Sequence, residues 1–127
     1  MDMWWAVGDE GGHVAEPEWA DIRARLHEIS LRSGIVEVES KSASGQLRSL
    51  QVRADNGAYV LTLGEESAEG WLFRILRQAS ADAGTLDILG DAWNAGLSGH
   101  DLDAVVGIFE PFVLTGTAPA EPSTSVD

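Results

Sequence analysis

The tripeptide Asp55-Asn56-Gly57 constrains the fold of this chain more than any other feature of its sequence. Before it, Leu50, Val52 and Ala54 alternate with polar residues, and the alternation resumes over residues 58–63. Asn-Gly favours the two-residue turns that join antiparallel strands, so these segments predict a β-hairpin. A hairpin is marginal alone, and its apolar face has to be covered by other elements.

The segment of residues 17–32 is predicted to form the first of two covering helices. Its apolar residues recur at spacings of three and four, which is typical of a helix with one buried stripe. Pro17 suits the first turn, and Gly34 lies where a C-terminal cap belongs. The buried stripe is predicted to consist of Trp19, Ile22, Leu26 and Ile29.

A second helix is predicted from Ser98 to Thr115. The Ser98 hydroxyl and Asp101, three residues later, match a capping box, and Gly116 follows the last turn. Pro111 removes one backbone hydrogen bond, so a kink is expected there. The buried stripe is predicted to consist of Leu102, Val105, Phe109 and Phe112, with Val106 and Val113 on the same face.

The remaining elements are predicted to be short strands joined by loops. Residues 71–77 could form a strand or a short helix, and their short length between Gly70 and Gly84 favours a strand. The order of elements predicts one α+β domain over residues 1–116, with an antiparallel sheet of about five or six strands, two helices packed on it, and a disordered tail at 117–127. Further strands are predicted at 3–7, 35–40 and 85–89, and loops at 8–12, 64–70 and 91–96.

Charge is the strongest compositional signal. The 127 residues carry a formal net charge of −13, and residues 54–127 contain twelve acids against two bases. Such a field repels nucleic acids and anionic membranes and attracts basic surfaces. The chain has no cysteine, and its apolar run near the start is short and flanked by acids, so we expect a cytoplasmic protein that binds neither membrane nor nucleic acid.

No motif in the sequence predicts catalysis or a cofactor. His13, His27 and His100 fall in different predicted elements and do not form a metal-ligand pattern. Pairs of carboxylates occur by chance among 21 acids, and no glycine pattern follows a strand as phosphate binding requires. We therefore expect no enzyme activity, metal or cofactor. The alternative is an enzyme or a small-ligand binder, which would need a pocket with convergent polar groups and shifted pKa values.

Acids beside tryptophans mark the candidate binding residues. Trp93 is either a core residue or an exposed anchor, and Trp is enriched among the residues that dominate protein interfaces. Two predicted loops place acidic residues next to Trp71 and Trp93. The candidate partner-binding residues are Glu65, Glu66, Glu69, Trp71, Asp87, Asp91 and Trp93.

Several short motifs over residues 47–119 suggest a family. They are Leu50-Gln51-Val52 before the turn, Tyr59-Val60-Leu61, the segment 86–93, the segment 109–112, and Thr115-Gly116 with Pro119. In these the chain resembles the small immunity proteins of bacterial polymorphic-toxin systems, in particular the family encoded beside deaminase toxins.

The resemblance implies a protein that binds one cognate toxin and occludes its active site without catalysis. The expected toxin is basic and acts on nucleic acid, as a deaminase or nuclease does, because a basic surface complements the acidic charge. An acidic adaptor or a secretion chaperone would use the same features to bind a partner without inhibiting it.

Overall fold

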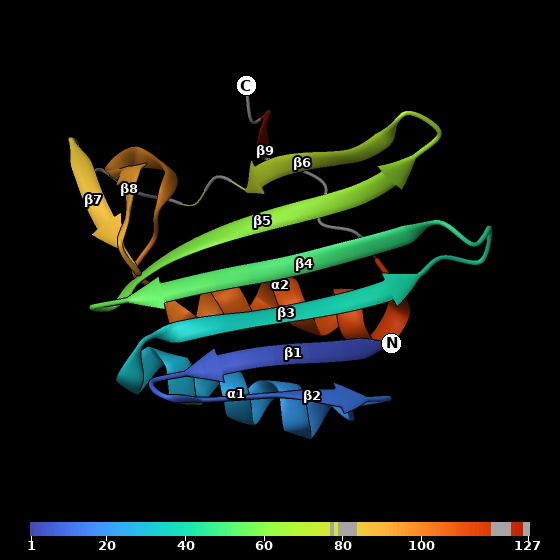
Figure 1. Cartoon of the computed structure of the whole chain (residues 1–127), viewed down its shortest axis with the longest axis horizontal. Helices are drawn as coiled ribbons and strands as arrows, with labels where there is room; N and C mark the ends of the chain where they lie inside the picture. Colours follow the sequence, from blue (N-terminus) through green and yellow to red (C-terminus); the bar gives the residue numbers. More distant parts are fainter. Residues whose placement is uncertain (77, 79–83, 118–122, 126–127) are drawn as a thin grey trace.

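The structure of the chain is a computed structural model that describes residues 1–76, 78, 84–117 and 123–125. It has the predicted α+β fold: an antiparallel sheet in the order β2-β1-β3-β4-β5-β6-β9, with both helices on one face and a separate β7-β8 hairpin (Figure 1). The elements are β1 (Asp2–Val7), β2 (Glu10–Ala15), α1 (Trp19–Arg32), β3 (Gly34–Lys41), β4 (Leu47–Asp55), β5 (Ala58–Ser67), β6 (Gly70–Leu76), β7 (Thr85–Ile88), β8 (Asp91–Asn94), a 3-10 turn (Ala95–Leu97), α2 (Leu102–Thr115) and β9 (Ser123–Ser125).

The predicted β4-β5 hairpin is present. Asp55 pairs with Ala58, and Asn56 and Gly57 have φ values of 51° and 78°, as a primed two-residue turn requires. The loop predicted over residues 64–70 is wrong except at residues 68–69, because β5 continues to Ser67 and pairs there with Gly70 at the start of β6. Pairing with β6 extends the strand past the point where apolar alternation ends.

The loop predicted over residues 8–12 is also wrong beyond its first two residues. β2 begins at Glu10 and pairs with β1 along its whole length, so His13 lies in a strand. A Cβ at Gly12 would lie 2.9 Å from the Trp5 indole nitrogen, so glycine makes room for that ring. Trp5 is half-buried on the core side, and Trp4 is exposed on the other face, as expected for neighbours in a strand.

Helix α1 matches the prediction closely. It begins at Trp19, two residues after the predicted start, and Glu18 and Asp21 form its capping box. Its C-terminal cap is Ser33, and not Gly34 as predicted. Gly34 is the first residue of β3, where a Cβ would collide with the carbonyl oxygen of Ala6 on β1.

Helix α2 begins four residues later than predicted. Asp101 is its N-cap and accepts a hydrogen bond from the Asp103 amide at 3.0 Å. The predicted cap, Ser98, is wrong: its hydroxyl donates to the Ala95 carbonyl and closes the preceding 3-10 turn. The helix runs through Pro111 to Thr115, and Gly116 ends it with φ 70°, as predicted.

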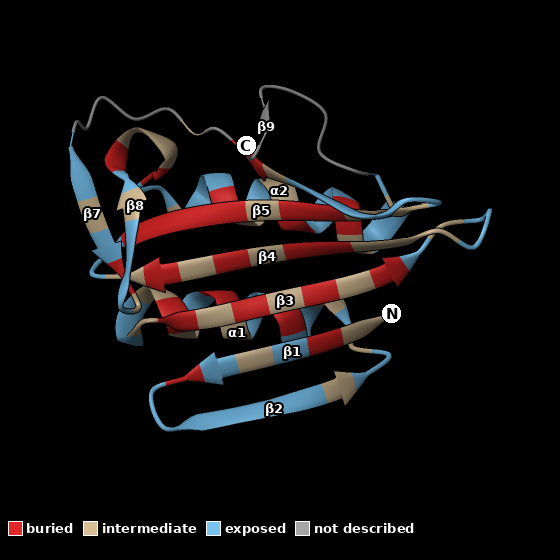
Figure 2. Cartoon of the chain, turned by 45° about the horizontal axis from the view of Figure 1, so that its top comes forward, coloured by how far each residue is buried: buried red, intermediate tan, exposed pale blue. Residues whose placement is uncertain are grey.

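The main core lies between the two helices and one face of the sheet. Figure 2 shows buried residues alternating along β3 and β4, as half-buried strands require. Trp19, Leu102, Val106 and Val113 are half-buried against this core, and the other residues of the two predicted stripes are fully buried. Those fully buried helix residues are Ile22, Leu26, Ile29, Val105, Phe109 and Phe112.

A second, smaller apolar cluster lies on the opposite face of the sheet, under the β7-β8 hairpin. Ile88 is fully buried there against Val60 and Ile75. The loop predicted over residues 91–96 is wrong, because residues 91–94 form β8 and pair with β7. Asp55 anchors the hairpin, since its carboxylate accepts a 2.9 Å hydrogen bond from the Leu89 amide at the β7-β8 turn.

The tail predicted to be disordered, residues 117–127, falls largely outside the described residues. Within it, Ser123–Ser125 form β9 and pair with residues 74–76 of β6. In the described ranges, no helix is both long and apolar enough to cross a membrane.

Candidate functional site

The face of the large sheet opposite the helices, here called the open face, carries the candidate site. Antiparallel register arranges its side chains in rows that cross the strands. The central rows are Trp4, Glu37, Gln51, Thr62 and Ile75; Asp2, Glu39, Ser49, Gly64 and Phe73; and Ala6, Ile35, Arg53 and Val60.

A chain of hydrogen bonds connects the polar side chains of the open face. The Gln51 amide donates to Glu37 Oε1 at 2.9 Å, and Arg53 Nε donates to Gln51 Oε1 at 3.1 Å. Arg53 Nη1 also forms an ion pair with Asp91 Oδ2 of β8 at 3.1 Å. The hairpin is therefore tied to the sheet by charge as well as by apolar contact, and Arg53 already has its anionic partner.

A recess of about 280 Å³ lies on the open face where the hairpin meets the sheet. The Phe73 ring lies over Gly64: a Cβ there would be 2.7 Å from Phe73 Cε1 and 2.8 Å from Ser49 Oγ. Glycine thus sets the shape of this part of the sheet, because any other residue would push the ring away. This hairpin recess is lined by Glu37, Ser49, Gln51, Arg53, Thr62, Phe73 and Trp93.

Trp93 forms part of the wall of the hairpin recess. It is half-buried and packs against the small cluster of Ile88 and its neighbours, so the alternative of a fully exposed anchor is wrong. Its indole nitrogen is shielded from solvent and has no hydrogen-bond acceptor among the described residues. A buried donor without an acceptor is uncommon in folded proteins and costs free energy.

The outer edge of β6 exposes three consecutive large apolar residues. Trp71, Leu72 and Phe73 have exposed fractions of 38%, 65% and 51%, and the rings of Trp71 and Phe73 stack at 5.9 Å. β9 covers β6 only at residues 74–76, so within the described chain no strand borders residues 70–73 on that side. We call residues 70–73 the β6 edge; it continues into the hairpin recess through Phe73.

The structure separates the candidate acids into different environments. Glu65 lies on the helix side and pairs with Arg74 at 3.1 Å. Glu66 is directly opposite Trp71, and its carboxylate accepts a hydrogen bond from the Leu47 amide. Glu69 is exposed in the turn before the β6 edge.

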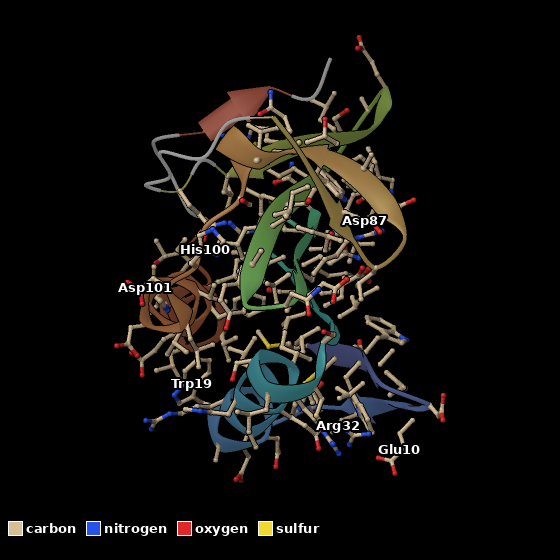
Figure 3. The ribbon with its side chains drawn as sticks, turned by 90° about the vertical axis from the view of Figure 1, so that its left-hand side faces the viewer. Glu10, Trp19, Arg32, Asp87, His100 and Asp101 are labelled. Carbon is tan, nitrogen blue, oxygen red and sulfur yellow. The ribbon has the colours of Figure 1, made fainter. Side chains whose placement is uncertain are left out.

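Asp87 and Asp91 occupy opposite sides of the hairpin. Asp91 points toward the sheet and binds Arg53, whereas Asp87 is exposed on the outer side. Figure 3 shows Asp87 and Asp101, at the start of α2, on opposite sides of the sheet. Of the seven candidates, Glu66, Trp71, Asp91 and Trp93 therefore face the open side of the sheet, with Glu69 and Asp87 at its margins.

Sequence reasoning missed four residues of this site: Glu37, Gln51, Arg53 and Phe73. The first three appear in the sequence only as the polar partners of alternating strands. Their proximity depends on the register between β3 and β4 and on the position of the hairpin, neither of which is local. The sequence contains one signal that could have identified them. The polar faces of two predicted strands carry side chains that can form hydrogen bonds with one another if the strands are neighbours.

The other end of the open face has a second hollow, of about 380 Å³, beside Trp4 and Glu37. The Trp4 ring stacks on His13 at 4.9 Å, and His13 Nε2 lies 2.9 Å from Asp2 Oδ1. His27 is exposed on α1. In the described parts of the chain, no three His, Cys, Asp or Glu side chains are grouped as a metal site would need.

The Tyr59 phenol has a clearly displaced pKa. Burial raises the pKa of the Tyr59 phenol above its usual 10.0; a hydrogen bond with Ser30 opposes this, and the charge of Asp101 adds to it. Tyr59 also exchanges backbone hydrogen bonds with Gly99. These contacts lie on the helix side of the sheet, so Tyr59 belongs to the core and not to the open face.

Comparison with known proteins defines the relatives of the chain. A hypothetical protein from Neisseria gonorrhoeae of known crystal structure aligns with a TM-score of 0.65 and 13% identity, over 95% of this chain and 91% of that one. At that identity the likeness concerns the fold alone. A search of curated proteins found no match. The model of a family of unknown function (DUF6911) matches residues 3–121, and the chain therefore belongs to that family.

Proposed function

We propose that this protein is an immunity protein that binds a cognate toxin through the open face and the β6 edge. The observation that carries the proposal is the β6 edge itself. Exposed apolar side chains are ordinary when scattered. Here Trp71 and Phe73 lie on the open side and Leu72 on the other side of a strand edge that no described strand covers, and this arrangement favours association. Trp and Phe are enriched in the centre of protein interfaces.

The charge of the protein selects the class of partner. Glu69 is exposed beside the β6 edge, and the whole chain carries −13. A basic partner is attracted to this field, and complementary charge accelerates association and disfavours other partners. Toxins that act on nucleic acid need basic surfaces to bind their substrates, and an inhibitor that covers such a surface blocks the substrate path.

The toxin assignment rests on the resemblance of residues 47–119 to immunity proteins, and the open face supplies a surface suited to it. Occlusion requires no chemistry from this chain. We propose that it acts in the cytoplasm as a stoichiometric inhibitor, without enzyme activity or a cofactor.

A co-expression experiment tests the function. The candidate partner is a toxin domain to be sought in the genes adjacent to this one. It is expressed in bacteria with and without the protein, and the purified domain is assayed with increasing amounts of the protein. We expect survival only with the protein, and loss of toxin activity at a one-to-one ratio. Binding without inhibition would support an adaptor instead, and absence of binding would refute the proposal.

A further inference from the structure

We propose that the hairpin recess is a socket for one arginine side chain of the bound partner, an inference that rests on the proposed function. The first argument is size. Pockets for cofactors and drug-sized molecules have volumes of roughly 300 to 1,000 Å³. The hairpin recess, at about 280 Å³, lies at the lower end of that range. It is large enough for one long side chain.

The second argument is charge. Arg53 is neutralised by Asp91 at 3.1 Å, and its Nε is bound to Gln51. Glu37 accepts one hydrogen bond from Gln51 and has no ion-pair partner among the described residues. Among the described residues, Glu37 is therefore a carboxylate of the recess that no cation neutralises. Because Glu37 is half-buried, a cation that reaches it is attracted more strongly than at the surface.

The third argument is the nature of the walls. Phe73 and Trp93 are both among the residues that line the recess. A guanidinium is planar, stacks on aromatic faces and binds carboxylates through two parallel hydrogen bonds. The ammonium of lysine is a strongly hydrated point charge and matches such a slot less well. The combination of two lining aromatic rings and a carboxylate without an ion-pair partner among the described residues therefore favours arginine.

The fourth argument is position. Phe73 belongs both to the hairpin recess and to the β6 edge. A partner segment that packs against Trp71 and Phe73 therefore passes the mouth of the recess. The arginine of this partner segment enters the recess beyond Phe73, where the β6 edge ends. Its position in the recess then fixes how the segment is aligned along β6.

Two variants of β3, each of which replaces one glutamate by uncharged glutamine, test the socket in the complex. Glu37→Gln keeps the shape and the hydrogen bond with Gln51 but removes the charge. Glu39→Gln removes the same charge from the same face, two residues away, outside the recess. The dissociation constant of the complex with the candidate toxin is measured by calorimetry. Glu37→Gln is expected to raise it roughly 30-fold, and Glu39→Gln is expected to raise it less than about threefold.

A small-molecule probe tests the socket independently of any toxin. N-acetyl-arginine amide is titrated into the ¹⁵N-labelled protein, with N-acetyl-citrulline amide as the uncharged control and N-acetyl-lysine amide as the alternative cation. We expect the arginine compound alone to shift the indole resonance of Trp93, which Trp93→Phe identifies, and Glu37→Gln to abolish the shift.

The outcomes separate the two proposals. If the toxin binds the wild type and Glu37→Gln behaves like Glu39→Gln, the socket is refuted and the immunity function stands. If the toxin does not bind, the function is refuted, and the titration decides the socket. Equal shifts with the lysine or citrulline compound, or no shift, overturn the arginine assignment.

Discussion

Replacing Phe109 by alanine tests whether α2 holds the sheet as the structure describes. Phe109 has no exposed surface and lies in the main core between α2 and the sheet. Burying a phenylalanine contributes about 1.5 to 3 kcal/mol, and the cavity left by its removal adds to the loss, giving roughly 3 to 5 kcal/mol in all. Domains of this kind have total stabilities of about 5 to 15 kcal/mol, so the loss is severe.

Urea unfolding followed by tryptophan fluorescence measures this loss. With a slope of about 2 kcal/mol/M, a loss of 4 kcal/mol lowers the midpoint by about 2 M while the slope stays constant. Leu114→Ala is the matched control, since Leu114 lies in the same helix and is 59% exposed; it should change stability by less than about 0.5 kcal/mol. A loss below about 1 kcal/mol for Phe109→Ala would show that this ring is not a core residue.

Three further predictions follow from individual side chains. Because burial raises the pKa of Tyr59, the unfolded chain loses this proton first as pH rises past 10.0, so stability should fall there; Tyr59→Phe should remove that part of the alkaline loss in urea titrations at pH 9 and 11. Trp93→Phe removes a buried donor without an acceptor and should cost less than about 1 kcal/mol in the same assay; a larger loss would mean that the indole nitrogen has a partner. Lysine at the exposed Glu69 should slow association with the toxin and weaken its salt dependence in surface-plasmon kinetics, whereas lysine at Glu110, exposed on α2, should have a smaller effect.

Local patterns predicted the elements whose period is visible in the sequence. β4 and β5 could be predicted because apolar residues alternate around Asn56-Gly57, and α1 because its stripe has helical spacing. β2 could not, because Gly11 and Gly12 weaken its strand signal and its backbone bonds depend on β1. β8 was missed for a similar reason: its four residues pair with β7 and pack on the sheet, and neither contact is local.

The candidate site was less predictable than the fold. The pattern of tryptophans beside acids predicted Trp71 and Trp93 as binding residues, and both lie on the open side of the sheet. Adjacency in sequence does not fix the direction of side chains in a strand, so Glu65, next to Glu66, faces the helices and pairs with Arg74. Glu37 can be assigned to the site only from the register between β3 and β4.

A strand edge that is open to a partner is also open to further copies of the same protein. No described strand pairs with the outer side of residues 70–73, which carry Trp71, Leu72 and Phe73, and an open apolar strand edge promotes aggregation. Every free copy, however, carries a charge of −13, and mutual repulsion keeps the copies apart. In the complex proposed above, a basic partner would cover the edge and cancel much of that repulsion in a single event. On that proposal, the acidic charge prevents association between free copies until the complex forms.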